Sequence, residues 1–335
     1  MKLAVLTILG AGLAAGLAPA VSKAAAADVP VACNRACYEG LVDRYLDAVV
    51  AHDPSRLPLS RTVRYTELGQ PMAVGDGFWN TASGIGGYKH YFVDPEAGQV
   101  GFYGTMKEGS NGALLLMALR LRVELGKITE IETSYYRKGA GPAWNDPGVD
   151  LLDTQGRPKA EWTRSVPPAQ RLTRAQLIDT ANSYFAGLQR NDGKGNYRFA
   201  PTCHRIENGI ATTNNSAMRP VAEGFNPMAM GCKAQFSTGY YAVVTSIHDR
   251  RYPVVDEERQ VVFAAGVFDM NATVRQITTP EGKTYPMAGF QRPGSIHISE
   301  AFQIEPSGLI NQIEAVGISA PYHLNPGWPG GTGGD

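Results

Sequence analysis

The sequence predicts an α+β protein of two tandem domains, each with helices packed on one face of a curved antiparallel sheet. Three observations predict this fold class. The chain has 335 residues, more than the roughly 100–200 residues of one average domain. Four sequence blocks occur twice in the same order. Within each copy a helical pattern of apolar residues precedes several strand-like runs, an order typical of α+β domains.

The repeat carries most of this argument. Any one matched pair of blocks can arise by chance, but four in the same order indicate a duplication. Two copies are too few for a solenoid of short units. The offset between the copies grows along the chain, so the second copy carries insertions. The matched blocks are 45–53 with 184–192, 64–69 with 204–209, 93–102 with 255–263, and 123–132 with 304–314.

Each copy begins with a helix. Apolar residues recur at helical spacing from Tyr38 to Val49 and again from Leu177 to Leu188. Turn residues end both helices, at 53–54 and 191–193. A short strand, a glycine turn and a small helix around Phe78-Trp79 are expected next.

Long strands complete each copy. Alternating or continuous apolar runs predict strands over 88–93, 99–106, 113–124 and 127–136, and Gly126 and Gly308 mark the last hairpin turns. The expected domains are residues 28–140 and 171–325. Glycine, proline and charge over 141–170 indicate a linker, and the Gly/Pro-rich residues 326–335 predict a disordered tail.

The first residues are typical of a secretory signal peptide. Lys2 precedes an apolar stretch over 3–20, and small residues lead to Ala25-Ala26-Ala27 before Asp28. An uncleaved membrane anchor and a lipoprotein attached through Cys33 are the alternatives. We favour a signal peptide over residues 1–27, because its many alanines and glycines make the stretch weakly apolar. The mature protein is then secreted or periplasmic.

Export allows the four cysteines to be interpreted as disulfides, because an oxidising compartment favours pairing. Three connectivities are possible. Cys33 and Cys37 stand within bridging reach at the start of a helix, which leaves Cys203 to pair with Cys232. The alternative, a metal bound by Cys33 and Cys37, lacks further ligands nearby. Because the six histidines are scattered, we expect no metal site.

The charge balance limits the partners. The chain has 31 Lys and Arg against 31 Asp and Glu, without a basic run. Phosphate contacts need clustered cations, so we expect no nucleic-acid partner. Membrane binding through a polybasic surface lacks support for the same reason, and we expect no membrane contact after signal cleavage. The expected partner is a small-molecule ligand or substrate.

The order of elements in each copy resembles the nuclear transport factor 2-like (SnoaL-like) superfamily. Residues 75–84 (GDGFWNTASG) and 93–102 (VDPEAGQVGF) resemble a largely uncharacterised family within it, made up of exported bacterial and fungal proteins. The resemblance covers about residues 33–320. It implies two tandem cone-shaped domains, each with a pocket between its helices and the concave sheet face. It also implies an intramolecular pseudo-dimer, in place of the homodimer common among single-copy relatives.

The superfamily resemblance is specific for the fold and weak for function. The superfamily hosts isomerases, dehydratases, cyclases, epoxide hydrolases, lyases and plain binding proteins. No family motif transfers a catalytic residue to this chain. Candidate residues therefore come from strand alternation and from differences between the two copies.

Strand alternation selects one carboxylate. In the strand over 113–124, Leu119 lies on the apolar face, and the repeat places Glu300 at the same position of the second copy, with Phe302 on the same face. A carboxylate among apolar side chains has a raised pKa unless it is paired. Glu300 is therefore the leading general acid or base. A salt bridge to an arginine such as Arg205 is the structural alternative.

The remaining candidates come from neighbouring segments. Asp269 is a further catalytic candidate beside Glu300, and Phe302 is a substrate-binding one. In the first copy His90 shares a strand face with Tyr88, and an imidazole among aromatic rings can shuttle protons or stack on a ligand. An ordinary core histidine is the alternative. The substrate-binding candidates around it are Trp79, Tyr88 and Tyr103.

Other polar residues receive structural interpretations. Glu67 and Glu207 recur before glycine turns in both copies, which favours a structural role over chemistry. Asp76 stands at an expected helix N-cap before Phe78-Trp79.

Two functions remain. GxSxG, HExxH and P-loop signatures do not occur, nor does GxGxxG between a strand and a helix, and we expect no cofactor. The first function is a cofactor-free lyase or isomerase that acts by general acid/base chemistry on a small aromatic or polyol-like molecule. The second is a non-catalytic exported binding or scaffold protein. Export, duplication and the carboxylate favour the first, whereas the absence of a specific motif favours the second.

Overall fold

The computed structural model describes residues 27–29 and 33–329, and in these ranges two six-stranded sheets dominate. The first sheet contains β1 (Leu59–Glu67), β2 (Gln70–Met72), β3 (Ala82–Asp94), β4 (Gln99–Glu108), β5 (Ala113–Glu124) and β6 (Lys127–Arg137). The second contains β7 (Phe199–Glu207), β8 (Ile210–Ala211), β9 (Ser246–Asp256), β10 (Val261–Met270), β13 (Gly294–Ile304) and β14 (Ile310–Ala320).

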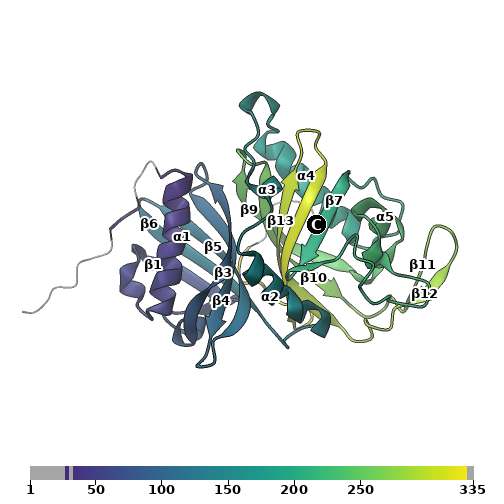
Figure 1. The fold of residues 1–335 in the computed structure, drawn as a ribbon, viewed down its shortest axis with the longest axis horizontal. Helices are drawn as coiled ribbons and strands as arrows, with labels where there is room; N and C mark the ends of the chain where they lie inside the picture. The colour runs from purple at the N-terminus through teal and green to yellow at the C-terminus, as the bar shows by residue number, and fades with distance from the viewer. Residues whose placement is uncertain (1–26, 30–32, 330–335) are drawn as a thin grey trace, which may run out of the picture.

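Helix α1 (Arg35–Val50) packs on the first sheet and α4 (Arg174–Leu188) on the second. The two halves lie side by side, the first in purple and blue and the second in green and yellow (Figure 1). The predicted α+β fold with two tandem helix-and-sheet domains is confirmed. Residues 1–26, which hold nearly all of the expected signal peptide, lie outside the described residues.

The duplication is visible in the strand order and register. The orders are β2-β1-β6-β5-β4-β3 and β8-β7-β14-β13-β10-β9, and in both sheets the first long strand runs parallel to the last. Thr133 stands opposite Glu67 on one side and Leu119 on the other. Ala315 stands opposite Glu207 and Glu300 in the same way. Leu119 and Glu300 therefore occupy equivalent positions, as the repeat predicts.

Local chemistry explains where the two main helices begin. The Asn34 side chain caps α1 by accepting a hydrogen bond from the Cys37 amide. Thr173 and Gln176 form a reciprocal capping box at the start of α4. The predicted disulfides are both present, Cys33 with Cys37 at the start of α1 and Cys203 with Cys232 in the second domain.

The segment between the domains is structured. It carries α2 (Asp146–Gln155) and α3 (Ala160–Thr163), which the sequence patterns did not predict. Val149 and Trp162 are buried between the domains. Gly148 faces the turn after β7, where a Cβ atom would lie 2.0 Å from the carbonyl oxygen of Asn208. Only glycine permits so close an approach of α2 to the second domain.

The sheet faces turned away from α1 and α4 meet each other. An apolar cluster that includes Phe92 and Phe263 spans both domains. At its edge the buried Glu132 accepts hydrogen bonds from Arg120 of its own domain and Arg251 of the other. Burial opposes ionisation of Glu132, but the two guanidinium groups lower its pKa to about 2.

The second domain carries the insertions that the growing offset predicts. They include helix α5 (Cys232–Ser237) and a hairpin of β11 (Gln276–Thr278) and β12 (Thr284–Pro286), which extends from one end of the molecule (Figure 1). No helix in the described part of the chain is long and apolar enough to cross a membrane.

The expected disordered tail is wrong for its first residues. Trp328 is buried, and its indole N–H donates to the Thr66 hydroxyl at 2.9 Å. The Arg64 guanidinium lies 4.0 Å from the indole ring centre. The Gly/Pro-rich composition predicts flexibility, but one large aromatic side chain is enough to dock the segment on the first domain. Residues 330–335 lie outside the described residues.

Candidate functional site

The second domain encloses a cavity of about 470 Å³, within the range of small-molecule sites. Most of its lining is apolar, from α4, the sheet and the segment after β12. Trp144, from the segment between the domains, also lines it. The principal apolar residues are Leu188, Val221, Met228, Val243, Val244, Phe268, Met270, Met287, Phe290, Ile296 and Ile298. The polar residues are Arg205, Glu207, Tyr240, Tyr241 and Glu300.

Glu300 projects from the middle of β13 into this cavity, and its side chain is buried. Its Oε2 atom is buried and has no hydrogen-bond partner among the described residues. Burial raises the pKa of Glu300 to about 8, although the charge of Arg205 and the Tyr184 hydroxyl oppose the rise. The structural alternative, a salt bridge between Glu300 and an arginine such as Arg205, is not formed within the described chain. The carboxyl group is therefore poised to exchange a proton near neutral pH.

Arg205, on β7, places a fixed positive charge at the cavity. One of its terminal nitrogens donates to Gln235 at 2.6 Å and to the Tyr241 hydroxyl, and the other donates to Tyr184 at 2.8 Å. These bonds hold the guanidinium in one orientation. Its Nε atom is buried and has no hydrogen-bond partner within the described chain. A ligand oxygen that reached this N–H would satisfy it.

Glu207 is a second carboxyl group in the cavity wall. Burial raises its pKa, and Arg205 opposes the rise. In the first domain the equivalent Glu67 accepts hydrogen bonds from the Tyr65 hydroxyl and the Phe78 amide, which supports the structural interpretation at that position. The Glu207 carboxylate makes no hydrogen bond to another residue of the described chain. Glu207 therefore does not have the structural role that Glu67 has in the first domain.

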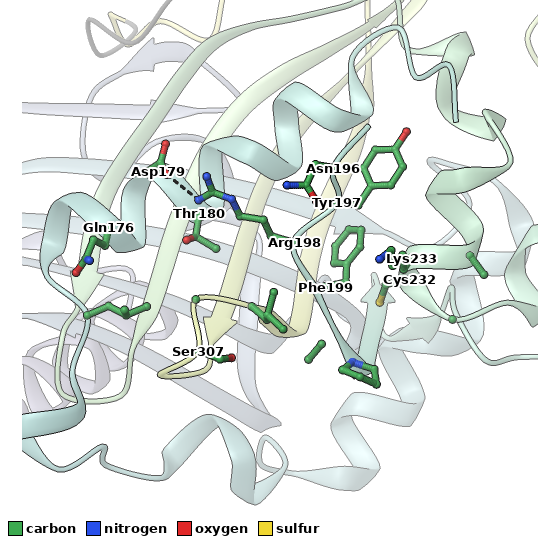
Figure 2. Close-up of a pocket in the computed structure, with 17 residues that line it drawn as sticks. Gln176, Asp179, Thr180, Asn196, Tyr197, Arg198, Phe199, Cys232, Lys233 and Ser307 are labelled. Atoms are coloured by element: carbon green, nitrogen blue, oxygen red, sulfur yellow. Dashed lines mark hydrogen bonds and ion pairs between the residues drawn. The ribbon is translucent and has the colours of Figure 1, made fainter. Parts of the chain in front are cut away.

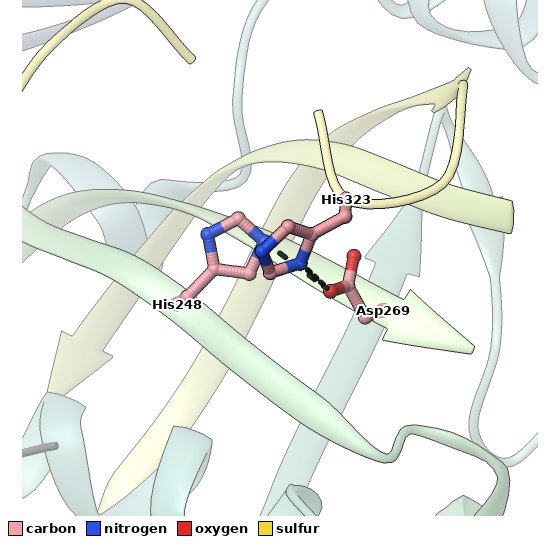
Figure 3. A group of neighbouring side chains, drawn as sticks. All are labelled: His248, Asp269 and His323. Atoms are coloured by element: carbon pink, nitrogen blue, oxygen red, sulfur yellow. Dashed lines mark hydrogen bonds and ion pairs between the residues drawn. The ribbon is translucent and has the colours of Figure 1, made fainter. Parts of the chain in front are cut away.

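The other two catalytic candidates lie elsewhere. Asp269 follows Phe268 on β10, so its side chain points to the opposite sheet face from the cavity. It contacts His248 and His323 there (Figure 3). His90 is buried at the domain interface, where its Nδ1 lies 2.8 Å from the Glu314 carboxylate. The three residues do not form one site.

The aromatic candidates are also dispersed. Trp79 is buried in the core of the first domain against Tyr45. Tyr88 and Tyr103 lie on the opposite face of that sheet, in the cluster shared with the second domain. Phe302 packs on Tyr184 in the core of the second domain and is not among the residues lining the cavity. Strand alternation places each ring on a face, but only the packing of the domains determines what covers that face.

Sequence reasoning missed part of the cavity. Arg205 entered only as a possible partner of Glu300, Glu207 only as a structural residue, and Tyr241 not at all. A residue-by-residue comparison of the two copies could have pointed to Arg205. Position for position, Tyr65 of the first domain becomes Arg205 in the second, since each stands opposite the equivalent isoleucine of the last strand.

A wider groove lies on the surface of the same domain between α4, β7 and α5 (Figure 2). Its volume is about 910 Å³, and an ion pair between Asp179 and Arg198 borders it. None of the buried, unpartnered polar atoms of the described chain belongs to its lining. We therefore take the cavity, with its two unsatisfied groups, as the candidate site.

A comparison with protein families finds a match over the part of the chain that supplies most of the cavity lining. A sequence profile described as "Domain of unknown function (DUF8021)" matches residues 170–317. That range holds Arg205, Glu207 and Glu300. No curated protein matches the chain.

Several solved structures resemble part of the chain. A "putative polyketide cyclase" from Silicibacter sp. TM1040 is 21% identical over 29% of this chain and 86% of its own, with a TM-score of 0.24. One from Pseudomonas putida KT2440 is 17% identical over 28% and 86%, also with a TM-score of 0.24. IdmH, a "putative polyketide cyclase" from Streptomyces antibioticus, is 13% identical over 35% and 95%, with the same TM-score of 0.24. Likeness this low transfers no chemistry to this chain.

Proposed function

We propose that the second domain is a cofactor-free lyase or isomerase in which Glu300 moves a proton on a small organic molecule bound in the cavity. One observation carries the proposal. A carboxyl oxygen of Glu300 and the Nε of Arg205 are both buried without hydrogen-bond partners in the described part of the chain, and both residues line one apolar cavity. Unsatisfied buried polar groups are costly, so a ligand that satisfies both is strongly favoured.

The lining indicates the substrate class. Methionine, phenylalanine and aliphatic side chains favour an aromatic ring or another flat apolar body. The polar groups cluster around Glu300 and Arg205, which suits a substrate with one oxygen-bearing end. A small aromatic carbonyl compound fits this division best, and a polyol-like molecule would use the same polar end.

The chemistry follows from the two charges. Ionised Glu300 takes a proton from a carbon next to a carbonyl group, and the electron pair of the C–H bond moves to the carbonyl oxygen. Arg205 stabilises the enolate oxygen, since a preorganised cation in a dry site favours developing negative charge. Neutral Glu300 then returns the proton to a different atom, which gives an isomerase. Alternatively it protonates a leaving group, which gives a lyase.

We place this activity outside the cytoplasm. The signal-like residues 1–27 motivate export, and the two disulfides are compatible with an oxidising compartment. The alternative function, a non-catalytic exported binding or scaffold protein, uses the same cavity without proton transfer.

The test measures proton abstraction without knowledge of the product. Small aryl ketones and sugar-derived carbonyl compounds are incubated with the protein in D₂O, and deuterium incorporation is followed by NMR. The wild-type protein should accelerate exchange for at least one compound. Glu300→Gln should slow it about 10²–10⁴-fold, and the matched control Glu223→Gln, at an exposed carboxylate, should not. An equal rate in folded Glu300→Gln rules out this role, and saturable binding without exchange supports the alternative.

A further inference from the structure

His248, Asp269 and His323 converge on one another in the second domain (Figure 3). Their ligand atoms all lie within 4.8 Å of one another. Asp269 points to the sheet face opposite the cavity, because its neighbours Phe268 and Met270 on β10 line the cavity. His248 comes from β9, Asp269 from β10 and His323 from the loop after β14. The sequence positions are so far apart that the scattered histidines predicted no metal site. The fold brings two of them to one carboxylate.

The hydrogen bonds of His248 leave one of its ring nitrogens facing that carboxylate. Its Nδ1 lies 2.7 Å from a carboxylate oxygen of Asp249, which can only accept, so Nδ1 carries a proton. In the neutral ring Nε2 then bears a lone pair. This buried Nε2 lies 3.4 Å from Oδ2 of Asp269 and has no hydrogen-bond partner among the residues that the structure describes. In this tautomer Nε2 and Oδ2 can each donate an electron pair to a cation placed between them.

Hydrogen bonds also orient the Asp269 carboxylate and the His323 ring. Ser295 donates to Oδ1 of Asp269, which leaves Oδ2 free for His248 and His323. The His323 Nδ1 lies 2.7 Å from Oδ2, and its side chain is 70% exposed. His248 stands opposite Val267, two residues before Asp269 on β10, so strand alternation puts both side chains on one sheet face.

We propose that this cluster is a divalent-metal site that takes Zn²⁺, with His248 Nε2, Asp269 Oδ2 and His323 Nδ1 as ligands and one open position. Two imidazoles and a carboxylate are a common zinc ligand set. A ligating histidine characteristically donates its other ring N–H to a carboxylate, and Asp249 supplies that carboxylate. This site is independent of the cavity and of Glu300.

The distances require only a small adjustment. Ligand atoms about 2.0–2.2 Å from a tetrahedral zinc stand about 3.3–3.6 Å apart. The 3.4 Å between His248 and Asp269 already fits. His323 Nδ1, now 2.7 Å from Oδ2, must move away from Asp269, and its exposed position on a loop allows this. Bound metal would tie that loop to the sheet a few residues before Trp328, which docks on the first domain.

The experiment uses the full chain without a histidine tag, with its native metal removed by chelation. Zinc affinity is measured by calorimetry, and Co²⁺ is used as a spectroscopic probe of tetrahedral coordination. We expect one Zn²⁺ per chain, and zinc should raise the melting temperature by several degrees. His323→Ala and His248→Ala should weaken binding at least 100-fold, and Asp249→Asn about 10–100-fold.

His204→Ala is the matched control, because His204 is exposed in the same domain and outside the cluster. It should bind zinc as the wild-type protein does. Folding of each variant is checked by circular dichroism, and the exposed His323 is the substitution least able to disturb the core. Absence of saturable zinc binding to the wild-type protein, or unchanged affinity in His323→Ala, would overturn the proposal.

Discussion

The guanidinium of Arg35, the first residue of α1, donates to both carboxylate oxygens of Asp256 in the other domain, at 2.8 and 2.7 Å. The equivalent residues form the same contact with the roles of the two domains exchanged. Arg174, the first residue of α4, donates to Asp94 of the first domain at 2.7 Å. Reciprocal contacts between equivalent residues characterise a two-fold interface. We propose that the chain forms an intramolecular pseudo-dimer in place of two identical subunits.

Asp256→Asn should destabilise the protein by about 2–3 kcal/mol, because Arg35 loses its buried carboxylate partner and keeps only the more exposed Glu258. Urea unfolding followed by circular dichroism measures the change. Glu108→Gln is the control, because the Arg137–Glu108 pair has similar geometry but is more exposed. It should cost less than about 1 kcal/mol. Equal costs for the two variants would argue against a special role of the interdomain pair.

Removal of the Glu300 carboxyl should stabilise the protein at alkaline pH. The pKa of Glu300 is about 8 in the folded protein against 4.5 for an ordinary glutamate, so the folded state retains a proton that the unfolded state has lost between these values. The free energy of unfolding therefore falls as pH rises through 4.5–8, by about 1.4 kcal/mol per unit of pKa difference. Glu300→Gln lacks this loss and should be the more stable protein at pH 9. Parallel unfolding curves at pH 5 and 9 check this, and a wild-type advantage at pH 9 would contradict it.

The proposed proton abstraction should follow the ionisation of the same group. If Glu300 acts as the base, the exchange rate rises with pH and levels off above about 8, where the carboxylate is fully formed. The profile of kcat/KM for deuterium incorporation measures this, with the rate of Glu300→Gln subtracted as background. A profile that is flat from pH 6 to 9 would assign the chemistry to another group.

His297 should make the protein sensitive to acid. Burial lowers its pKa to about 4 from 6.5, although Glu132 opposes the change, and neither ring nitrogen has a hydrogen-bond partner within the described chain. Between pH 6.5 and 4 the unfolded state takes up a proton that the folded state does not, so stability falls as pH is lowered. The full loss is about 3 kcal/mol.

The acid sensitivity is best measured in the Glu300→Gln background, which removes the opposite slope of Glu300. His297→Leu in that background should flatten the pH dependence of unfolding between pH 6.5 and 4. A slope as steep as before the second substitution would show that His297 is not responsible.

The disulfide between Cys203 and Cys232 should contribute about 3.6 kcal/mol, since it closes a loop of 29 residues. The double substitution to serine tests this by chemical denaturation. Cys33 and Cys37 are only four residues apart and should contribute about 2 kcal/mol on the same entropic argument. If loss of the short bridge proves the more damaging, chain entropy is not the source of the stabilisation.

Short-range sequence patterns were sufficient to predict the fold class and one residue of the candidate site, Glu300. Alternation within β5 and β13 placed Leu119 and Glu300 on apolar faces, and the repeat made them equivalent. The same patterns predicted both disulfides, because each pair lies within one copy. Local patterns did not predict the helices in the segment over 141–170. Helix α2 is short, and its Gly148, which weakens a helical pattern, is there because a turn of the second domain packs against it.

Long-range packing decided everything that depends on which faces meet. His90 and Glu314 are 224 residues apart in the chain, and only the contact between the sheets makes them neighbours. Arg205 and Glu207 joined Glu300 because β7 pairs with β14, and His248, Asp269 and His323 joined because β9, β10 and the final loop adjoin. The two-residue period of a strand is a local property, so the sequence alone determines which side of a strand each residue takes. What covers that side depends on the burial of apolar surface by distant elements, and only the tertiary structure decides it.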